Sequence, residues 1–208
     1  MSKLIIIAGP QSSGKTTTLN YLKKKHKDWY FVDEVNPRTI TGKKNFGAVN
    51  TNADLEERIL NGDIDNIEKI DRKKDTVILE SGIFHYVYAR YFLYKKLADR
   101  YFGEYLQAHQ GLKPYVFFIK TDLEVCFERR KSMYLKRILE KGVNDKTIID
   151  KHLNEYKKIM EAIYPFWFDC YKKVPFPKIS IENSYKAKND YLKEAEEIIK
   201  SLLSQKSP

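Results

Sequence analysis

The chain is poor in the residues that crosslink or interrupt a fold. Its 208 residues include two cysteines, nine glycines and seven prolines. Two cysteines make no disulfide framework, and Cys126 and Cys170 do not have the spacing of metal ligands. So few glycines and prolines exclude a collagenous or low-complexity chain, and a hydrophobic content of 42% excludes a disordered one.

Long apolar runs are also missing. No segment approaches the roughly 20 residues that a membrane-spanning helix requires. The first apolar run, residues 4–8, is shorter than the about 7–15 residues at the centre of a signal peptide. We therefore expect a cytoplasmic protein with no membrane partner, folded as one domain over residues 1–208 that buries its own core.

The charge balance is strongly basic, with 38 Lys and Arg against 28 Asp and Glu and a net charge of +10. This excess suits an anionic partner such as a nucleotide or a nucleic acid. The basic residues are scattered along the chain, however, so lysines on solvated helix faces explain the same excess. Charge alone does not choose between these interpretations.

Short apolar runs alternate with longer segments of helical periodicity, which is typical of an α/β fold with a mainly parallel sheet. Strands are expected at residues 4–8, 29–32, 76–79, 115–119 and 178–181. Helices are expected at residues 15–25, 54–71, 123–140, 146–164 and 185–203, with a helical aromatic stretch at 83–110. Breaks are expected at Asn61-Gly62 and near Gly103. This order of elements predicts an α/β fold with three layers, a parallel sheet of about five strands with helices on both faces.

Residues 9–16 match the P-loop pattern G-x-x-x-x-G-K-[ST], with a strand before the motif and a helix beginning inside it. Gly9 and Gly14 let the backbone turn tightly around phosphate oxygens, and the helix N-terminus adds a partial positive charge. Lys15 reaches the β- and γ-phosphates, and the Thr16 hydroxyl suits Mg²⁺. Together with the strands and helices above, this motif predicts a three-layer P-loop NTPase sandwich. The predicted ligands are ATP and Mg²⁺. The predicted nucleotide-binding residues are Gly9, Gln11, Ser12, Ser13, Gly14, Lys15, Thr16 and Thr17.

The hallmarks of a switch GTPase are absent from the sequence. A GTPase binds guanine with Asn-Lys-x-Asp after a strand, and here Ile119 stands in place of the Asn. A GTPase also has Asp-x-x-Gly after the third strand, and here that segment begins with Glu80. Motor ATPases usually need a longer chain. A kinase therefore fits best.

Carboxylates follow two of the predicted strands. Glu80 ends the third strand at the edge where α/β sheets bind ligands, so it could hold the water shell of Mg²⁺; an exposed strand-end glutamate is the less favoured alternative. Asp33 and Glu34 follow the second strand, and one of them could act as the general base on an acceptor hydroxyl. A loop or helix cap is the alternative. Side chains alternate along a strand, so only one of the two can face the ligand.

Residues 118–130 resemble the fourth strand and following helix of deoxynucleoside kinases, which read roughly apolar-x-T-x-P-E-x-C-x-x-R, and the related thymidylate kinases. Glu124, Cys126 and Arg129 fall on matching positions. The resemblance favours Glu34 as the base. It also implies a lid at about residues 129–146 whose arginines close over the transferring phosphate. The candidate lid arginines are Arg129, Arg130 and Arg137, for which a solvated basic helix face is the alternative.

One departure from the family concerns the acceptor. The family usually has Glu-Arg-Ser after the third strand, with the arginine on the reacting end of the acceptor, whereas this chain has Glu80-Ser81-Gly82. Arg38 and Arg90 are the candidate replacements.

The aromatic stretch after Glu80 lies where related kinases pack their acceptor, so Tyr86 and its neighbours could stack on a base. Core packing is the safer interpretation, because positions 84, 88, 91 and 92 trace one helical face. His85 is expected to be a surface or capped residue. Asn183 follows the last strand, where P-loop kinases often hold adenine, although a plain turn explains it nearly as well.

These features predict an ATP- and Mg²⁺-dependent kinase that transfers the γ-phosphate to a small acceptor, foremost a nucleoside or nucleoside monophosphate. Two alternatives stay open: a polynucleotide 5′-end kinase or RNA-processing factor, and a regulatory nucleotide-binding NTPase. Dimerisation is common in the families that the chain resembles, so a homodimer is an open expectation. The acceptor's identity and the choice of ATP over GTP also stay open.

Overall fold

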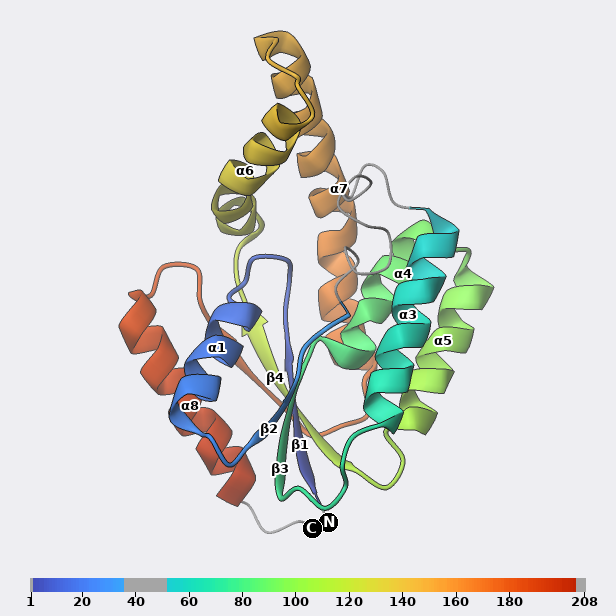
Figure 1. Cartoon of the computed structure of the whole chain (residues 1–208), viewed down its shortest axis with the longest axis vertical. Coiled ribbons are helices and arrows are strands. Elements are labelled where there is room, and N and C mark those ends of the chain that lie inside the picture. Colours follow the sequence, from blue (N-terminus) through green and yellow to red (C-terminus); the bar gives the residue numbers. More distant parts are fainter. Residues whose placement is uncertain (1, 36–51, 205–208) are drawn as a thin grey trace.

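The computed structural model describes residues 2–35 and 52–204, built around one parallel sheet with the strand order β2-β3-β1-β4-β5 (Figure 1). The strands are β1 (Lys3–Ala8), β2 (Tyr30–Val32), β3 (Thr76–Glu80), β4 (Lys113–Lys120) and β5 (Lys178–Glu182). The helices are α1 (Lys15–Lys25), α3 (Ala53–Glu68), η2 (Gly82–His85), α4 (Tyr86–Phe92), α5 (Lys95–Ala108), α6 (Leu123–Glu140), α7 (Lys146–Lys173) and α8 (Lys188–Ser204). The expected five-stranded parallel sheet is confirmed.

The central strand β1 is buried on both faces, which explains its continuous apolar run. Leu4 and Ile6 belong to the core beneath α3, α4, α5 and α7, whereas Ile5 and Ile7 belong to the core beneath α1 and α8. Figure 1 shows these two groups of helices on opposite sides of the sheet. The strand alternation thus divides the interior into two cores, and the three-layer arrangement is confirmed.

The helices α6 and α7 project from the sheet as a paired arm (Figure 1). Their own small core includes Tyr134 on α6 and Tyr156 on α7, whose rings stack with centroids 3.9 Å apart. Tyr134 also donates a hydrogen bond of 2.9 Å to the Gln11 side chain. This hydrogen bond joins the arm to the loop after β1. The expected lid, residues 129–146, comprises most of α6 and the turn into α7.

Several helix boundaries differ from the prediction. Helix α3 continues through Gly62, and α5 continues through Gly103, while the break in the aromatic stretch falls at Leu93, whose backbone is extended. Helix α7 runs past Pro165, although a proline costs about 3 kcal/mol inside a helix. The buried Ile163, Trp167 and Cys170 share one face of α7, and their packing offsets the lost hydrogen bond.

Parallel pairing brings the carboxyl ends of the strands to one edge of the sheet. Ile7 pairs with Glu80 and Ala8 with Phe118, so β1, β3 and β4 end at nearly the same level. The loops that follow these strands begin side by side. Within residues 2–35 and 52–204, no helix has the length and apolar character to span a bilayer.

A buried carboxylate joins α1 to α8. Glu196 accepts hydrogen bonds from Lys25 at 2.7 Å and from the Tyr21 hydroxyl at 2.9 Å, and its other oxygen lies 2.8 Å from the Lys200 ammonium. Burial by itself would raise the pKa of Glu196, but these donors hold it well below the ordinary value. The folded state therefore favours the ionised carboxylate more strongly than the unfolded chain does.

We predict that Glu196→Gln lowers the free energy of unfolding at pH 7 by about 1–3 kcal/mol, the usual contribution of hydrogen bonds to a charged group. The pKa of Glu196 is depressed on folding, so this stabilisation is present above the unfolded pKa of about 4.3 and is lost as the pH falls. Urea unfolding from pH 7 to pH 3 should show the two proteins converging. The exposed Glu197→Gln is the matched control. An equal loss in both variants would contradict the prediction.

Candidate active site

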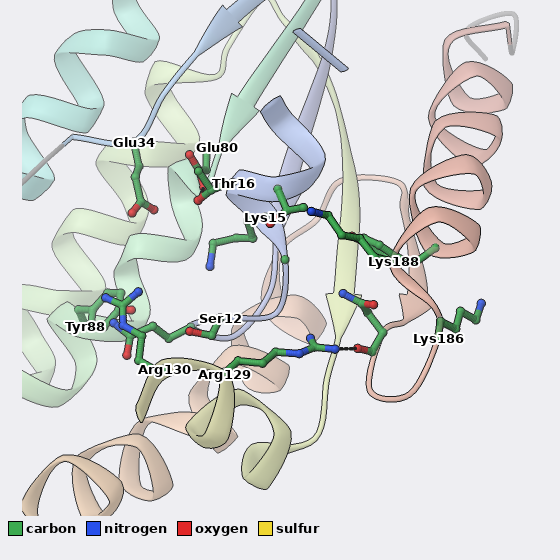
Figure 2. Close-up of a pocket in the computed structure, with 15 residues that line it drawn as sticks. Ser12, Lys15, Thr16, Glu34, Glu80, Tyr88, Arg129, Arg130, Lys186 and Lys188 are labelled. Atoms are coloured by element: carbon green, nitrogen blue, oxygen red, sulfur yellow. Dashed lines mark hydrogen bonds between the residues drawn. The ribbon is translucent and has the colours of Figure 1, made fainter. Parts of the chain in front are cut away.

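A cavity of about 460 Å³ lies at the carboxyl edge of the sheet, between the loop after β1 and the base of the α6–α7 arm (Figure 2). This volume is in the range of small-molecule sites. The residues predicted from sequence that line it are Gln11, Ser12, Gly14, Lys15, Thr16, Thr17, Glu34, Glu80, Arg129, Arg130 and Asn183. Four lining residues that the sequence did not single out for a site role are Tyr88, Lys186, Lys188 and Tyr191.

The glycines of the P-loop sit where a side chain does not fit. Gly9 has φ +146°, and a Cβ there would lie 2.4 Å from the Ile119 carbonyl oxygen. Gly14 has φ +113°, and a Cβ there would lie 2.8 Å from the Asn183 amide nitrogen. The loop is therefore pressed against β4 on one side and against the segment after β5 on the other. Such a tight turn aims backbone N–H groups at a bound anion.

Lys15 is buried within this loop. Its ammonium donates to the carbonyls of Gly9 at 2.9 Å and Pro10 at 3.1 Å, and lies 5.0 Å from the centre of the Trp167 ring. Burial lowers the pKa of Lys15, and the nearby carboxylates of Glu34 and Glu80 oppose this effect. The Ser13 hydroxyl is also buried, and no hydrogen-bond partner for it lies among the residues described. A charged amine and an unsatisfied hydroxyl in one loop fit a phosphate-binding site.

The two predicted metal ligands meet. The Thr16 hydroxyl donates a 2.6 Å hydrogen bond to Glu80. Burial and the nearby Glu34 carboxylate raise the pKa of Glu80, so a cation beside it would be stabilising. No group of three acidic, histidine or cysteine ligands occurs in the described ranges. The Thr16–Glu80 pair fits Mg²⁺, because this ion usually binds one or two carboxylates together with substrate phosphates and water.

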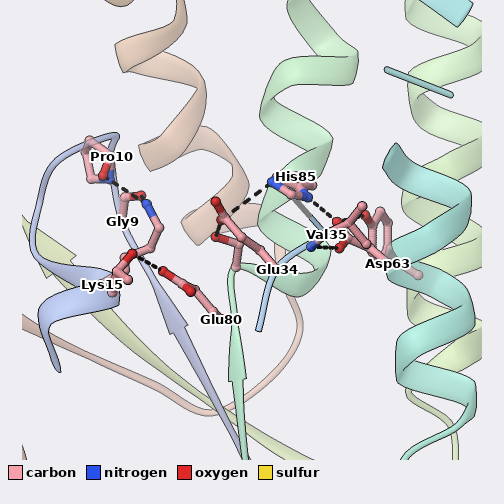
Figure 3. Close-up of polar contacts among 11 residues, drawn as sticks. Gly9, Pro10, Lys15, Glu34, Val35, Asp63, Glu80 and His85 are labelled. Carbon is pink, nitrogen blue, oxygen red and sulfur yellow. Dashed lines mark hydrogen bonds and ion pairs between the residues drawn. The ribbon is translucent and has the colours of Figure 1, made fainter. Parts of the chain in front are cut away.

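The two carboxylates after β2 point different ways. Asp33 is 62% exposed and pairs with Lys23 at 2.6 Å. Glu34 is half-buried, lines the cavity and accepts a 2.7 Å hydrogen bond from the Ser81 hydroxyl (Figure 3). The alternation along the chain thus leaves Glu34 in position for acid–base chemistry.

The backbone after β3 holds Ser81 in an unusual conformation. Its φ of +61° lies in the left-handed region, which residues with a side chain seldom adopt. Ser81 is fully buried, and its N–H donates to the Ile7 carbonyl. The strained turn therefore delivers the Ser81 hydroxyl to Glu34.

The prediction that His85 is a surface or capped residue is wrong, because only 7% of it is exposed. One ring nitrogen is hydrogen-bonded to Asp63 of α3, and the other lies 3.7 Å from Glu34 (Figure 3). Asp63 also accepts from the Val35 N–H at 3.0 Å. The sequence did carry a signal for this pair: Asp63 stands in line with Ile59 and Ile67 on the apolar face of α3.

The pKa values of Glu34 and His85 move in opposite directions. Burial by itself would raise the pKa of Glu34, but the charges of His85 and Lys15, with the Ser81 hydrogen bond, leave it below the ordinary value. Burial by itself would lower the pKa of His85, but Asp63 and Glu34 raise it to about 9. At neutral pH both groups are charged, as an ion pair.

The three predicted lid arginines have different positions. Arg129 donates to the carbonyl of Asn183 at 2.7 Å and to that of Ser184 at 3.3 Å. Arg130 lines the cavity near Tyr88 (Figure 2). Arg137 is not among the lining residues, and its charge acts on Tyr156 within the arm. The structure brings two of the three arginines to the site.

The predicted acceptor residues do not gather at this cavity. Tyr86 and Arg90 line a second cavity of about 320 Å³ between α4, α5 and α7, where Tyr86 donates to Asp99. Arg38 lies outside the described residues. Within the aromatic stretch, Phe84 is buried as expected, but Tyr91, placed on the same face by its spacing, is 38% exposed.

The deoxynucleoside kinase family matches residues 5–204 of this chain. Among solved structures, the YorR protein from Bacillus subtilis in complex with phosphorylated GDP is similar, with 17% identity and a TM-score of 0.59, covering 99% of this chain and 100% of its own. A deoxyadenosine kinase from M. mycoides with the products dCMP and dCDP has 15% identity and a TM-score of 0.60, with 96% and 98% covered. A shikimate kinase from Acinetobacter baumannii with shikimate has 15% identity and a TM-score of 0.52, with 99% and 97% covered. A comparison with curated proteins finds no match.

We predict that Gly9→Ala weakens nucleotide binding about tenfold or more, because the added Cβ displaces a loop whose N–H groups face a charged ligand. Titration with a fluorescent ATP analogue measures the change. Gly103→Ala is the matched control, because nothing lies within 4 Å of a Cβ there and alanine favours the helix by about 0.5–1 kcal/mol. Unchanged affinity in Gly9→Ala would show that the loop tolerates the methyl group.

Proposed function

Since this chain belongs to the deoxynucleoside kinase family, we propose that it transfers the γ-phosphate of ATP, with Mg²⁺, to a hydroxyl group of a nucleoside. Membership makes the chain a P-loop phosphotransferase of the nucleoside kinase type. The observation that carries the finer proposal is the Glu34 carboxylate, which lines the P-loop cavity and is ionised at neutral pH.

An ionised Glu34 favours a hydroxyl acceptor over a monophosphate. A hydroxyl must lose its proton during transfer, and a carboxylate within reach can accept it. A phosphate acceptor is already deprotonated and needs no base, so a carboxylate beside the P-loop is better matched to a hydroxyl. The similar deoxyadenosine kinase from M. mycoides has the product dCMP bound, which is consistent with a nucleoside acceptor.

The donor side of the proposal rests on the P-loop. Lys15 and the amides of the turn would hold the triphosphate, and Thr16 with Glu80 would hold Mg²⁺. The metal would offset charge on the phosphates. The Lys15 ammonium donates its hydrogen bonds to the neutral carbonyls of Gly9 and Pro10. A bound phosphate would replace these carbonyls with a charged acceptor, which forms the stronger hydrogen bond.

We further propose that residues 129–146 act as a lid. Arg130 lines the cavity and Arg129 joins α6 to the segment after β5 through Asn183, so the base of the arm touches both ends of the site. Arg130 would offset charge on the transferring group. Asn183 would lie beside the adenine.

We predict that Glu34→Gln lowers the rate of phosphoryl transfer about 10²–10⁴-fold while ATP affinity stays near that of the wild type, because the amide keeps the shape and loses the basicity. ATP consumption is measured against a panel of nucleosides and nucleoside monophosphates, with Lys15→Ala as the blank. Asp33→Asn is the matched control, since Asp33 is exposed and paired with Lys23. Full activity in Glu34→Gln, or a comparable loss in Asp33→Asn, would remove Glu34 from its role.

We predict that Glu80→Gln raises the Mg²⁺ concentration for half-maximal activity about 10–100-fold, the usual effect of disturbing groups around a metal. The reason is that Glu80 both receives the Thr16 hydrogen bond and faces the cavity. The measurement is a Mg²⁺ titration of activity at saturating ATP. The same Mg²⁺ dependence in variant and wild type would exclude Glu80 from the metal site.

A further inference from the structure

We propose that His85, held in place by Asp63, is a positioning residue that keeps Glu34 ionised and oriented toward the acceptor. This inference rests on the proposed function, because it takes Glu34 as the general base. It concerns a histidine and an aspartate that the P-loop chemistry does not use. The sequence favours Arg38 or Arg90 as the basic residue near the acceptor. Within residues 2–35 and 52–204, the structure places His85 beside Glu34, at 3.7 Å.

The geometry links three elements in one line. Asp63 comes from α3, His85 ends η2, and Glu34 follows β2 (Figure 3). The His85 ring has one nitrogen hydrogen-bonded to Asp63 and the other 3.7 Å from the same Glu34 oxygen that accepts from Ser81. One Glu34 oxygen thus has two partners from the segment after β3, which restricts the carboxylate to one orientation.

Asp63 is arranged to hold the ring. Its Oδ1 accepts from the Val35 N–H, and its Oδ2 accepts from the Tyr105 hydroxyl at 3.2 Å as well as facing His85. Asp63 is 4% exposed, so its charge is screened little by water. The Val35 contact also fixes the residue next to Glu34. Asp63 therefore binds both the histidine and the backbone that carries the base.

The charges around His85 favour the imidazolium over the neutral ring. Among the described residues, the main groups that act on it are Glu34 after β2 and Asp63 and Glu56 on α3, and Tyr88 on α4 meets its ring edge-on. Three of these are carboxylates, and none of the four is a cation. A charged His85 then lowers the pKa of Glu34, together with Lys15 and Arg130. His85 thus adds a positive charge beside Glu34 from the segment after β3.

The test measures the ionisation of Glu34 directly. Protein labelled with ¹³C at glutamate carboxyl groups is titrated by NMR, and the Glu34 signal is assigned by its absence in Glu34→Gln. We expect His85→Gln to raise the pKa of Glu34, because the cation 3.7 Å away is removed. The double variant His85→Gln/Asp63→Asn should raise it too, and it leaves no unpaired buried charge that could prevent folding.

His109→Gln is the matched control. His109 is also a buried histidine, but it binds the Tyr105 carbonyl and packs on Phe176, away from Glu34. It should leave the titration of Glu34 unchanged. Thermal unfolding of each variant separates lost stability from lost positioning, because a purely structural role would lower stability without moving the Glu34 signal.

A second readout follows the reaction. The pH profile of kcat/KM is recorded for transfer from ATP to an equimolar mixture of the four deoxynucleosides. In His85→Gln the acid limb should move to higher pH, with a loss of about tenfold on that limb for each pKa unit that Glu34 rises and recovery to the wild-type rate above the limb. A uniform loss at all pH values would assign His85 a structural role and overturn the proposal.

The outcomes separate the two proposals. An unchanged Glu34 titration in both His85 variants overturns the role of His85, whatever the activity. No transfer by the wild type to any nucleoside of the panel, together with a raised Glu34 pKa in His85→Gln, refutes the proposed acceptor and leaves the effect of His85 on Glu34 established.

Discussion

Parallel pairing of five strands is the constraint on which the site depends. Because each strand ends at the same edge, the loops that follow β1, β2, β3 and β5 converge although they are far apart in the chain. The P-loop follows β1, Glu34 follows β2, Glu80 ends β3 and Asn183 follows β5. The carboxyl edge of a parallel sheet is where α/β folds bind their ligands. The same pairing requires a crossover connection between each strand and the next, and the helices of these connections form most of the two helical layers.

Two carboxylates at this edge have different electrostatic surroundings. Burial and the charge of Glu34 raise the pKa of Glu80, whereas His85 and Lys15 leave the pKa of Glu34 below its ordinary value in spite of burial. Such separation often distinguishes the roles of neighbouring acids. Glu80 is thereby suited to a cation and Glu34 to a proton. Glu34 lies 3.7 Å from His85, and this contact contributes to the difference between the pKa values of the two glutamates.

The elements that could be predicted are those whose structure depends on residues close together in the sequence. The buried run at β1 and the P-loop after it are set by neighbours in sequence, so their places were predictable. Predictions failed where distant packing outweighed a local rule. Pro165 suggests a helix end near residue 164, but Trp167 and Cys170 are buried against the sheet and α7 continues to Lys173. Gly103 is a different case, because nothing lies within 4 Å of a Cβ there, and α5 continues through it at the modest cost of a glycine inside a helix.

The sequence by itself determined the P-loop, the five strands and the carboxylates that follow them, because these depend on spacing along one segment. Tertiary structure decided which residues meet. It turned Glu34 inward and Asp33 toward Lys23, joined His85 to Asp63, and carried Tyr86 to a different cavity. These contacts join segments from different elements, and their energies depend on distance and burial in three dimensions. The hydrophobic periodicity of a single segment carries no information on such distances, which is why Glu34 was predicted at the site and His85 beside it was not.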